Sequence, residues 1–204
     1  MKLWVKEHLS RNQKNKILII LYSPYWIRDI LFCWLKGLSW NSSWRFNRLP
    51  IIHITTRGSI RIGENFICTS SPWHNSIGVN QKVILKTLKT DSTINIGDDV
   101  GISGCTISAA KSITVGDRVL IGSGCLITDS DAHPILVKHR NNVTKIKINP
   151  VVIEDDCFIG ARSIILKGVR IGAGSVVGAG SVVASDVPKG VVVAGNPARL
   201  LKEL

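Results

Sequence analysis

A six-residue repeat of aliphatic residues constrains the fold of this chain more than any other feature. Each repeat begins with Ile or Val, usually followed by a small or acidic residue, as in IGDDVG from Ile96 and IGSGCL from Ile121. The spacing breaks at two places, and the first positions are Ile62, Ile96, Ile102, Val115, Ile121, Ile127, Ile153, Ile159, Ile165, Ile171, Val177 and Val183. One such unit is a short strand plus a turn, and three units close a triangular coil of about 18 residues. The spacing therefore predicts an all-β solenoid of stacked parallel strands, since no amphipathic helix shows this period.

The fifth position of the repeat indicates which side chains point inward near a corner. Most of these residues are small or β-branched, and they are Val100, Thr106, Val119, Cys125, Cys157, Ser163, Val169, Ser175 and Ser181. Cys125 and Cys157 are therefore predicted to pack as small buried side chains, whereas Cys105, one place earlier, is not assigned by the pattern. The five cysteines contain no CxxC pair, which favours reduced thiols in a cytosolic protein over zinc or a disulfide framework.

Two stretches interrupt the repeat. The longer one, HPILVKHRNNVTKIKINP from His133 to Pro150, is polar, basic and aperiodic, so we expect a loop ejected from the solenoid near residues 134–150. Residues 68–91 form the second interruption. Loops that leave a rigid scaffold commonly carry function.

The first 50 residues differ from the rest in composition. They are predicted to be mainly helical, and residues 1–61 hold 11 Lys/Arg against Glu7 and Asp29, a balance of 11 − 2 = +9 out of a total of +12. Five of the six Trp residues also fall within residues 1–44. Charge and Trp together favour an anionic partner such as a membrane surface, but a helix packed on the main domain or on a partner subunit, or a solvated surface, explains them equally well. No stretch is apolar and long enough for a spanning helix, and no signal peptide is expected.

The segment DSDAHP, from Asp129 to Pro134, carries the candidate catalytic chemistry. A histidine at the mouth of an ejected loop can be neutral near pH 7 and accept a proton from a substrate hydroxyl. Asp131, Asp129 or a backbone carbonyl could fix its tautomer. Turn capping is the plainer role for both aspartates. On composition alone His133 would be an ordinary solvated turn histidine, but its place before Pro134, at the mouth of an ejected loop after regular hexads, favours the catalytic role.

Three segments resemble the hexapeptide-repeat acyltransferases. They are ITVGDRVLIGSGCLITDSDAHPI, PVVIEDDCFIGARSIILKGVRIGAGSVVGAGSVVASDVP and VVVAGNPARLLK, which are similar to galactoside, maltose and nodulation-factor acetyltransferases and to those of capsule and O-antigen clusters. The resemblance implies a left-handed parallel β-helix, a homotrimer with acetyl-CoA between subunits, and His133 as the catalytic base. It covers roughly residues 94–204.

The resemblance also implies where acetyl-CoA binds. Gly160, Ala161, Gly178 and Ala179 would border the pantetheine arm, and Arg199 in GNPAR would bind a phosphate. Lys167 and Lys189 would add charge, and Phe158 would lie near the cofactor. A narrow groove beside an extended amide chain leaves no room for side chains, and a phosphate suits a fixed guanidinium.

The acceptor site departs from that family. Where the sugar enzymes carry a carboxylate in the first coils, this chain has Lys111, with Ser103 and Ser108 nearby. Trp73 and His74 are further candidates for binding a sugar, although packing explains them as well.

The sequence therefore predicts an N-terminal helical segment at 1–50, an acyltransferase β-helix at 51–198 and a C-terminal tail at 199–204. We expect a cytoplasmic acetyl-CoA-dependent O-acetyltransferase that acts on a saccharide hydroxyl, peripheral at the inner face of the membrane. N-acetylation of an amino sugar, xenobiotic acetylation and a non-catalytic scaffolding module are the alternatives. No metal is expected, because a zinc site of the carbonic anhydrase type needs three histidines and only His139 follows His133 closely. No specific nucleic acid is expected, since no recognition motif is present.

Overall fold

The computed structural model describes residues 25–204, which form two units divided after Trp40. In the first unit, residues 25–35 are helical, and the helix ends in a turn at Gly37, whose φ of +69° suits a residue without a side chain. Trp26 and Trp40 meet edge to face there, with ring centroids 5.3 Å apart. The predicted helical residues 1–24 lie outside the described part of the chain. No helix within residues 25–204 is long and apolar enough to cross a membrane.

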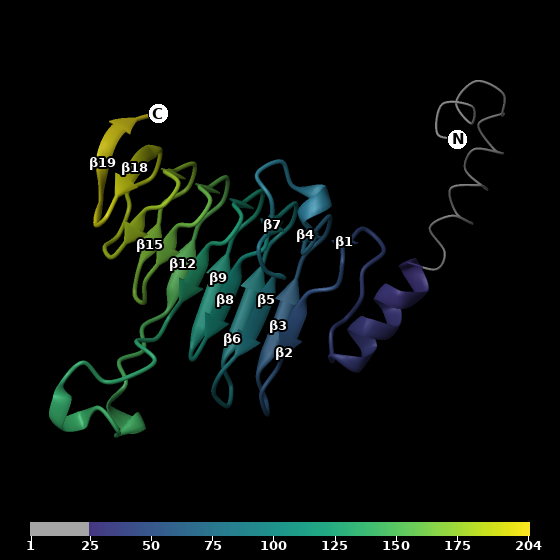
Figure 1. Cartoon of the computed structure of the whole chain (residues 1–204), viewed down its shortest axis with the longest axis horizontal. Helices are drawn as coiled ribbons and strands as arrows, with labels where there is room; N and C mark the ends of the chain where they lie inside the picture. The colour runs from purple at the N-terminus through teal and green to yellow at the C-terminus, as the bar shows by residue number, and fades with distance from the viewer. Residues whose placement is uncertain (1–24) are drawn as a thin grey trace. The chain divides into compact units, whose positions relative to one another are not determined.

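The second unit is a left-handed parallel β-helix made of three sheets, as predicted (Figure 1). The first sheet contains β1 (Arg45–Asn47), β4 (Ile67–Thr69), β7 (Gly101–Ser103), β10 (Leu120–Ile121), β13 (Phe158–Ile159), β16 (Val176–Val177), β18 (Val191–Gly195) and β19 (Ala198–Glu203). The second contains β2 (Ile51–His53), β5 (Ile84–Thr87), β8 (Thr106–Ala109), β11 (Leu126–Thr128), β14 (Ile164–Ile165) and β17 (Val182–Val183). The third contains β3 (Ser59–Ile62), β6 (Thr93–Ile96), β9 (Ser112–Val115), β12 (Val151–Ile153) and β15 (Arg170–Ile171).

The repeat explains why strands three apart in the chain pair with each other. Along the second sheet, one inward column runs from coil to coil through Ile52, Leu85, Ile107, Ile127, Ile165 and Val183. These side chains are at most 3% exposed. Each coil places its inward aliphatic residue directly over that of the preceding coil, at the spacing of about 4.8 Å between paired strands. The stacked side chains therefore form one continuous apolar core.

Small side chains at the fifth position close the corners, as predicted. Cys125 and Cys157 are buried, and each thiol donates to a carbonyl of the next coil, Gly160 O at 3.1 Å and Gly172 O at 3.3 Å. Ser163 makes the same contact to Gly178 O at 3.0 Å. Cys105, which the pattern left open, is also fully buried.

Three edges join the sheets, and each is defined by its turns. The first edge, between the first and second sheets, holds residues 70–83, 104–105, 122–125, 160–163 and 178–181. The second edge, between the second and third sheets, holds residues 54–58, 88–92, 110–111, 129–150 and 166–169. The third edge, between the third and first sheets, holds residues 63–66, 97–100, 116–119, 154–157 and 172–175.

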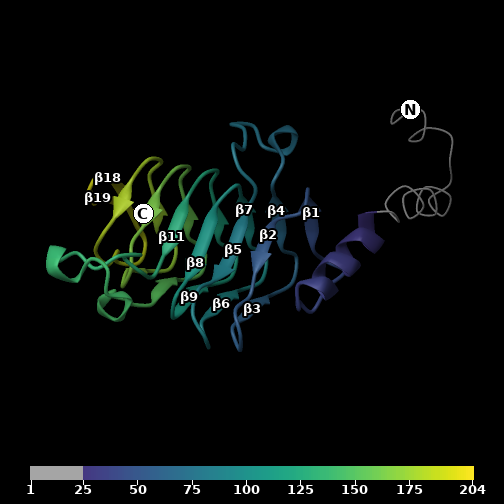
Figure 2. The ribbon, with the colours of Figure 1, turned by 60° about the horizontal axis from the view of Figure 1, so that its bottom comes forward.

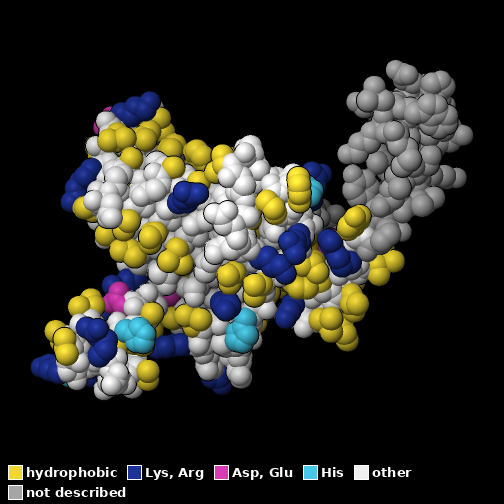
Figure 3. All heavy atoms as spheres, in the orientation of Figure 1, with side chains coloured by type: hydrophobic (Ala, Val, Ile, Leu, Met, Phe, Trp, Pro, Cys, Tyr) yellow, Lys and Arg dark blue, Asp and Glu magenta, His cyan; other side chains and the backbone are white. Residues whose placement is uncertain are grey.

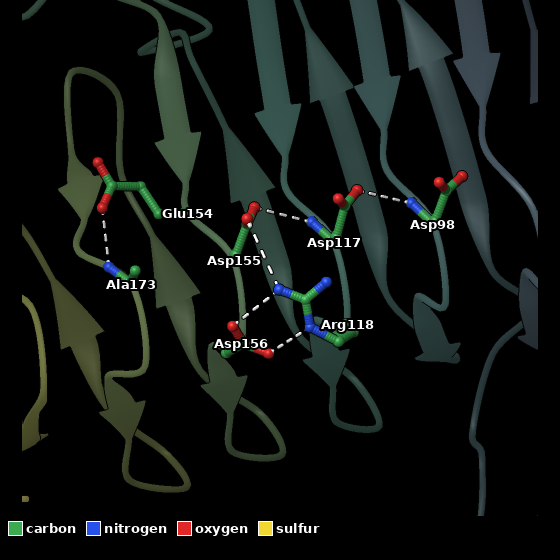
Figure 4. Close-up of polar contacts among 7 residues, drawn as sticks. All are labelled: Asp98, Asp117, Arg118, Glu154, Asp155, Asp156 and Ala173. Atoms are coloured by element: carbon green, nitrogen blue, oxygen red, sulfur yellow. Dashed lines mark hydrogen bonds and ion pairs between the residues drawn. The ribbon is translucent and has the colours of Figure 1, made fainter.

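Carboxylates connect successive turns along the third edge (Figure 4). The Asp98 amide donates to Asp117 Oδ1 at 2.9 Å, and the Asp117 amide donates to Asp155 Oδ1 at 3.0 Å. Arg118 forms a paired contact with Asp156, through Nε at 2.6 Å and Nη2 at 2.9 Å. The acidic residues of the repeat thus satisfy turn amides that no strand reaches.

The ends of the solenoid differ from the predicted borders. β1 lies within the segment expected to be helical and pairs with β4, so the first coil begins earlier than residue 51. The predicted tail at 199–204 is mostly β19, which runs antiparallel to β18 and covers the open edge of the last coil. Neither β1 nor β19 belongs to the six-residue repeat, so the spacing of aliphatic residues did not predict these two strands.

Two loops leave the solenoid (Figure 2). Residues 70–83 project from the first edge and contain one 3₁₀ turn, Pro72–His74. Residues 131–147, here called the arm, project from the second edge with 3₁₀ turns at Val137–His139 and Val143–Lys145. A bridge between Ser130 and Ile148 closes the base of the arm.

Candidate active site

His133 lies at the base of the arm, where a tight turn presents it to solvent. Ala132 has a φ of +60°, and the His133 amide donates to Asp131 O at 2.6 Å. Pro134 is buried while His133 is exposed. The buried proline therefore fixes the backbone directly after the exposed imidazole ring. The His133 side chain makes no hydrogen bond or ion pair with any part of residues 25–204. Its ring nitrogens are therefore available for a substrate proton.

Asp129 has a structural role in the turn below His133. Its carboxylate is fully buried and accepts the amides of Ala110 at 2.6 Å, Lys111 at 2.7 Å and Ser112 at 2.8 Å. These three hydrogen bonds stabilise the two-residue turn of the preceding coil and occupy both oxygens of the carboxylate. Of the two aspartates that the sequence offered as partners of His133, Asp129 is thus occupied elsewhere.

Asp131, two residues before His133 in the chain, remains as the candidate orienting carboxylate. Its Oδ1 forms an ion pair with Lys167 Nζ at 2.5 Å, and both side chains are largely buried, at 18% and 21% exposed. Its Oδ2 is buried and has no hydrogen-bond partner among residues 25–204. A buried acceptor without a donor is costly, so Oδ2 is the one atom at the arm base that still needs a hydrogen bond. Lys167, which we expected to add charge at the cofactor, thus pairs with Asp131 at the base of the arm.

The glycine-alanine steps predicted to border acetyl-CoA lie at the first edge, across the second sheet from His133. A Cβ on Gly160 would lie 2.5 Å from the Ala179 amide nitrogen, and one on Gly178 would lie 2.7 Å from Ala194 Cβ. These glycines therefore allow the turns to stack closely. Ala161 and Ala179 carry only methyl groups at the same edge, so the stack leaves a smooth strip along the solenoid.

The remaining predicted cofactor residues lie on three different parts of the last coils. Phe158 points outward from β13 and is 47% exposed. Arg199 is exposed at the start of the β18–β19 hairpin, and its Nη1 donates to Ala198 O at 3.1 Å. Lys189 lies near the third edge, beyond Gly172, whose Cβ would meet the Lys189 backbone. The structure thus does not gather Lys189 with the first-edge strip within one chain.

The predicted acceptor residues separate into two groups. Ser108, on β8, and Lys111, in the following turn, belong to the second edge with His133. Ser103, on β7, belongs to the first sheet, and Trp73 and His74 lie in the loop at the first edge. Trp73 is 92% exposed, so it does not pack into the core formed by the described residues.

A hollow beside the second edge was not indicated by the repeat. It has a volume of about 740 Å³ and lies between the turns of the first two coils, lined by residues that include His53, Thr55, Leu88 and Lys89. The only sequence signal for it is turn length, because residues 54–58 and 88–92 are longer than the turn at 110–111.

The buried thiols are poor candidates for chemistry. Burial raises the pKa of the Cys68 thiol to about 12, and it raises the pKa values of Cys105, Cys125 and Cys157 as well. A thiol with a raised pKa is protonated near neutral pH and is a weak nucleophile. No group of three His, Cys, Asp or Glu side chains within residues 25–204 could hold a metal ion.

Comparisons with known proteins agree with the repeat and the fold. The family model described as the hexapeptide repeat of succinyl-transferase matches residues 150–185. The 2,3,4,5-tetrahydropyridine-2,6-dicarboxylate N-acetyltransferase of Staphylococcus aureus is 41% identical over 90 residues, which are 44% of this chain and 33% of that protein. The enzyme of the same name from Clostridium perfringens is 64% identical over 55 residues, 27% of this chain and 23% of that protein. The chain thus spans a third or less of the curated relatives that it matches.

Among solved structures, the acetyltransferase domain of PglB from Neisseria gonorrhoeae, in complex with acetyl coenzyme A, has a similar fold. Its TM-score is 0.51 at 19% identity, over 81% of this chain and 60% of that chain. Fold and repeat together define the chain as a hexapeptide-repeat, left-handed β-helix protein.

Proposed function

We propose that this protein is an acetyl-CoA-dependent O-acetyltransferase that acts on a saccharide hydroxyl. The observation that carries the proposal is the exposed, unpartnered imidazole of His133 at the base of the arm, on a solenoid with the hexapeptide repeat. The N-acetyltransferases matched by sequence and the acetyl-CoA complex matched by fold support the donor.

In this mechanism His133 is the general base. Its neutral ring accepts the proton as the substrate oxygen attacks the thioester carbonyl carbon, and a C–O bond forms. The C–S bond then breaks, and the CoA sulfur leaves with the proton returned from His133. A positioned base of this kind typically contributes about 10²–10⁴-fold to the rate.

Asp131 orients the base. Oδ2 of Asp131 has no partner among residues 25–204, and in this proposal the His133 ring turns toward it when substrate binds and donates its second N–H. That bond would fix the tautomer and stabilise the imidazolium that forms during attack. The ion pair with Lys167 holds the carboxylate in place. Asp131 is therefore a positioning residue, and Lys167 acts through it.

The first-edge strip fits the acyl donor. Gly160, Ala161, Gly178 and Ala179 leave no side chain in the path of an extended amide chain, and exposed Arg199 can bind a phosphate at the end of the solenoid.

A second copy of the chain completes the site in this proposal. His133 and the strip lie at opposite edges of the second sheet. On each of the two sheets that meet at the first edge, one outward column is largely apolar. It includes Ile67, Leu120 and Phe158 on the first sheet and Ile51 and Leu126 on the second, each 37–54% exposed. The corresponding column of the third sheet is Arg61, Asn95, Thr114, Val152 and Arg170. Apolar faces on two sheets and a polar face on the third suit a closed homotrimer.

The helix at residues 25–35 supports contact with the cytoplasmic face of a membrane. Ile27, Leu31, Trp34 and Leu35 lie on one side of it and are 53–73% exposed. An apolar Trp-containing face in a strongly basic segment is typical of helices that lie in the headgroup region. We expect co-sedimentation with vesicles of anionic lipid, lost on L31E/W34E substitution and absent with neutral lipid. Equal sedimentation of the double variant would contradict this contact.

N-acetylation of an amino sugar is the alternative, and it is favoured by the names of the relatives matched by sequence. The two reactions share the donor and the base. An acceptor panel with matched hydroxyl and amino sugars separates them.

The test is the release of CoA from acetyl-CoA with such a panel, using the wild type and His133→Ala. We expect turnover with a hydroxyl acceptor and a loss of about 10²-fold or more in the variant, with an unchanged circular dichroism spectrum. His139→Ala, on the arm, is the matched control. A fully active His133→Ala protein would overturn the mechanism, and turnover of amino acceptors alone would replace O-acetylation by N-acetylation.

A further inference from the structure

Turn lengths along the second edge create a notch at the third coil. The first two coils turn through residues 54–58 and 88–92, and the fourth sends out the arm, but the third turns tightly through residues 110–111. At about 4.8 Å per coil, the second and fourth coils stand about 10 Å apart. Figure 3 shows the outline of the molecule drawn inward between the arm and the turns of the first coils.

Unpaired cations line this notch. Lys111 is exposed at its floor, and Lys89 is exposed in the turn that forms one wall. Lys86 and His53 follow on the outer face of the second sheet, where His53 pairs in register with Lys86 and Lys86 with Ser108. None of these four side chains forms an ion pair within the part of the chain that the structure describes.

The carboxylates in the neighbouring turns are already engaged. Asp91 pairs with Arg57 at 3.0 Å. Asp129 accepts three backbone amides, and Asp131 pairs with Lys167. Asp91 and Asp131 are thus offset by cations, whereas Asp129 keeps its charge, because backbone amides are neutral. Lys86, Lys89 and Lys111 outnumber Asp129, so the notch carries net positive charge.

The hollow between the turns of the first two coils extends the notch away from His133. His53, Thr55 and Lys89 contribute to its lining, and it is wide open to solvent, so a ligand there would remain partly exposed. A ligand with its hydroxyl at His133 would place its next groups over Lys111 and Lys89.

We propose that the notch is an acceptor site for an anionic saccharide, whose carboxylate or phosphate binds Lys111 and Lys89. The inference rests on the proposed acetyl transfer at His133 and names its substrate class. Lys111 and Lys89 select the acceptor by charge and take no part in proton transfer.

Binding without acetyl donor tests this independently of catalysis. The full-length protein is titrated calorimetrically with trigalacturonate, with glucose 1-phosphate and with neutral maltotriose. We expect one of the two anions to bind about tenfold or more tighter than maltotriose, with an affinity that falls as salt rises. K111Q and K89Q each weaken that binding about fivefold. Lys82→Gln, an exposed lysine of the loop at the first edge, is the matched control and leaves it unchanged.

The outcomes distinguish a carboxylate ligand from a phosphate ligand, and they test the anion site separately from the proposed acetyl transfer. Preference for trigalacturonate identifies a carboxylate, and preference for glucose 1-phosphate identifies a phosphate. The anion site would be overturned if maltotriose bound as tightly as the anions or if neither anion bound. It would also be overturned if Lys82→Gln weakened anion binding as much as K111Q and K89Q do. Lysine-dependent anion binding without acetyl transfer to any acceptor would leave the notch and overturn the proposed function.

Discussion

At the scale of single residues, the proposal that Asp131 orients His133 gives the sharpest prediction, because Asp131 pairs with Lys167 through Oδ1 and leaves Oδ2 without a partner among residues 25–204. Replacing it with Asn removes the negative charge and the pairing with Lys167, so His133 loses its orienting acceptor. We expect kcat to fall about tenfold or more with little change in KM for acetyl-CoA. Steady-state kinetics beside Asp186→Asn, an aspartate of a later turn, measures this. Equal kcat in Asp131→Asn and wild type would show that the ring is oriented by another group.

The buried thiols give a second prediction at this scale. Burial raises the pKa of Cys68 to about 12, so the reactive thiolate is scarce at any pH below that value. Cys68, Cys105, Cys125 and Cys157 are therefore expected to be unreactive toward a thiol reagent at pH 8 in the folded protein and to react on unfolding. Fast labelling of the native protein at one of these positions, located by mass spectrometry, would contradict the packing.

The residues also show what the sequence could and could not predict. The repeat correctly indicated buried Cys125 and Cys157, because a corner position fixes both burial and size. It could not decide between Asp129 and Asp131, because both flank the same turn and only the fold shows that three amides of the preceding coil occupy Asp129. Nor could it place Lys167 against Asp131, since that pair joins two coils.

At the scale of elements, the carboxylates that connect the turns of the third edge predict how the stability of the fold responds to acid. The hydrogen bond with Arg118 lowers the pKa of Asp156 below 3.8, and the Ala173 amide lowers that of Glu154 below 4.5. A carboxyl with a depressed folded pKa stabilises the fold fully above its ordinary pKa, and the stabilisation is lost as pH falls through the depressed value. We expect the urea midpoint to decline below about pH 4.5. The decline should be smaller in a D156N/E154Q variant, and an identical pH profile would contradict this prediction.

The arm gives the second element-scale prediction. Its large apolar side chains Ile135, Leu136, Val137 and Val143 are 60–83% exposed, so it adds little to the core. Replacing residues 135–146 with a short Gly-Ser linker should leave the thermal midpoint nearly unchanged while acetyl transfer falls sharply, because a ligand at His133 would lose one wall. A large drop in the midpoint would show that the arm is part of the core.

Elements outside the repeat were predicted least well. β1 pairs with β4 at one end of the solenoid, and β19 pairs with β18 at the other. Neither sequence contains an aliphatic hexad. The notch was missed for a similar reason, since it arises from a difference in turn length between neighbouring coils. The interior coils were predicted correctly because one period sets their strands, turns and core together.

At the scale of the whole molecule, the proposed site needs more than one copy of the chain. His133 lies at the second edge, and the strip proposed to bind the acyl donor lies at the first. Two inactive variants should therefore complement each other, because a mixed assembly pairs an intact base with an intact strip. His133→Ala removes the base, and Ala179→Trp blocks the strip.

Co-expression of these two variants, followed by measurement of CoA release, tests whether His133 of one copy acts on acetyl-CoA bound at the strip of another. Each variant alone should be nearly inactive. With random assembly, about one site in four combines an intact His133 with an intact strip, so the mixture should recover about a quarter of wild-type turnover. Mixed oligomers with no more activity than either variant alone would contradict a site shared between copies.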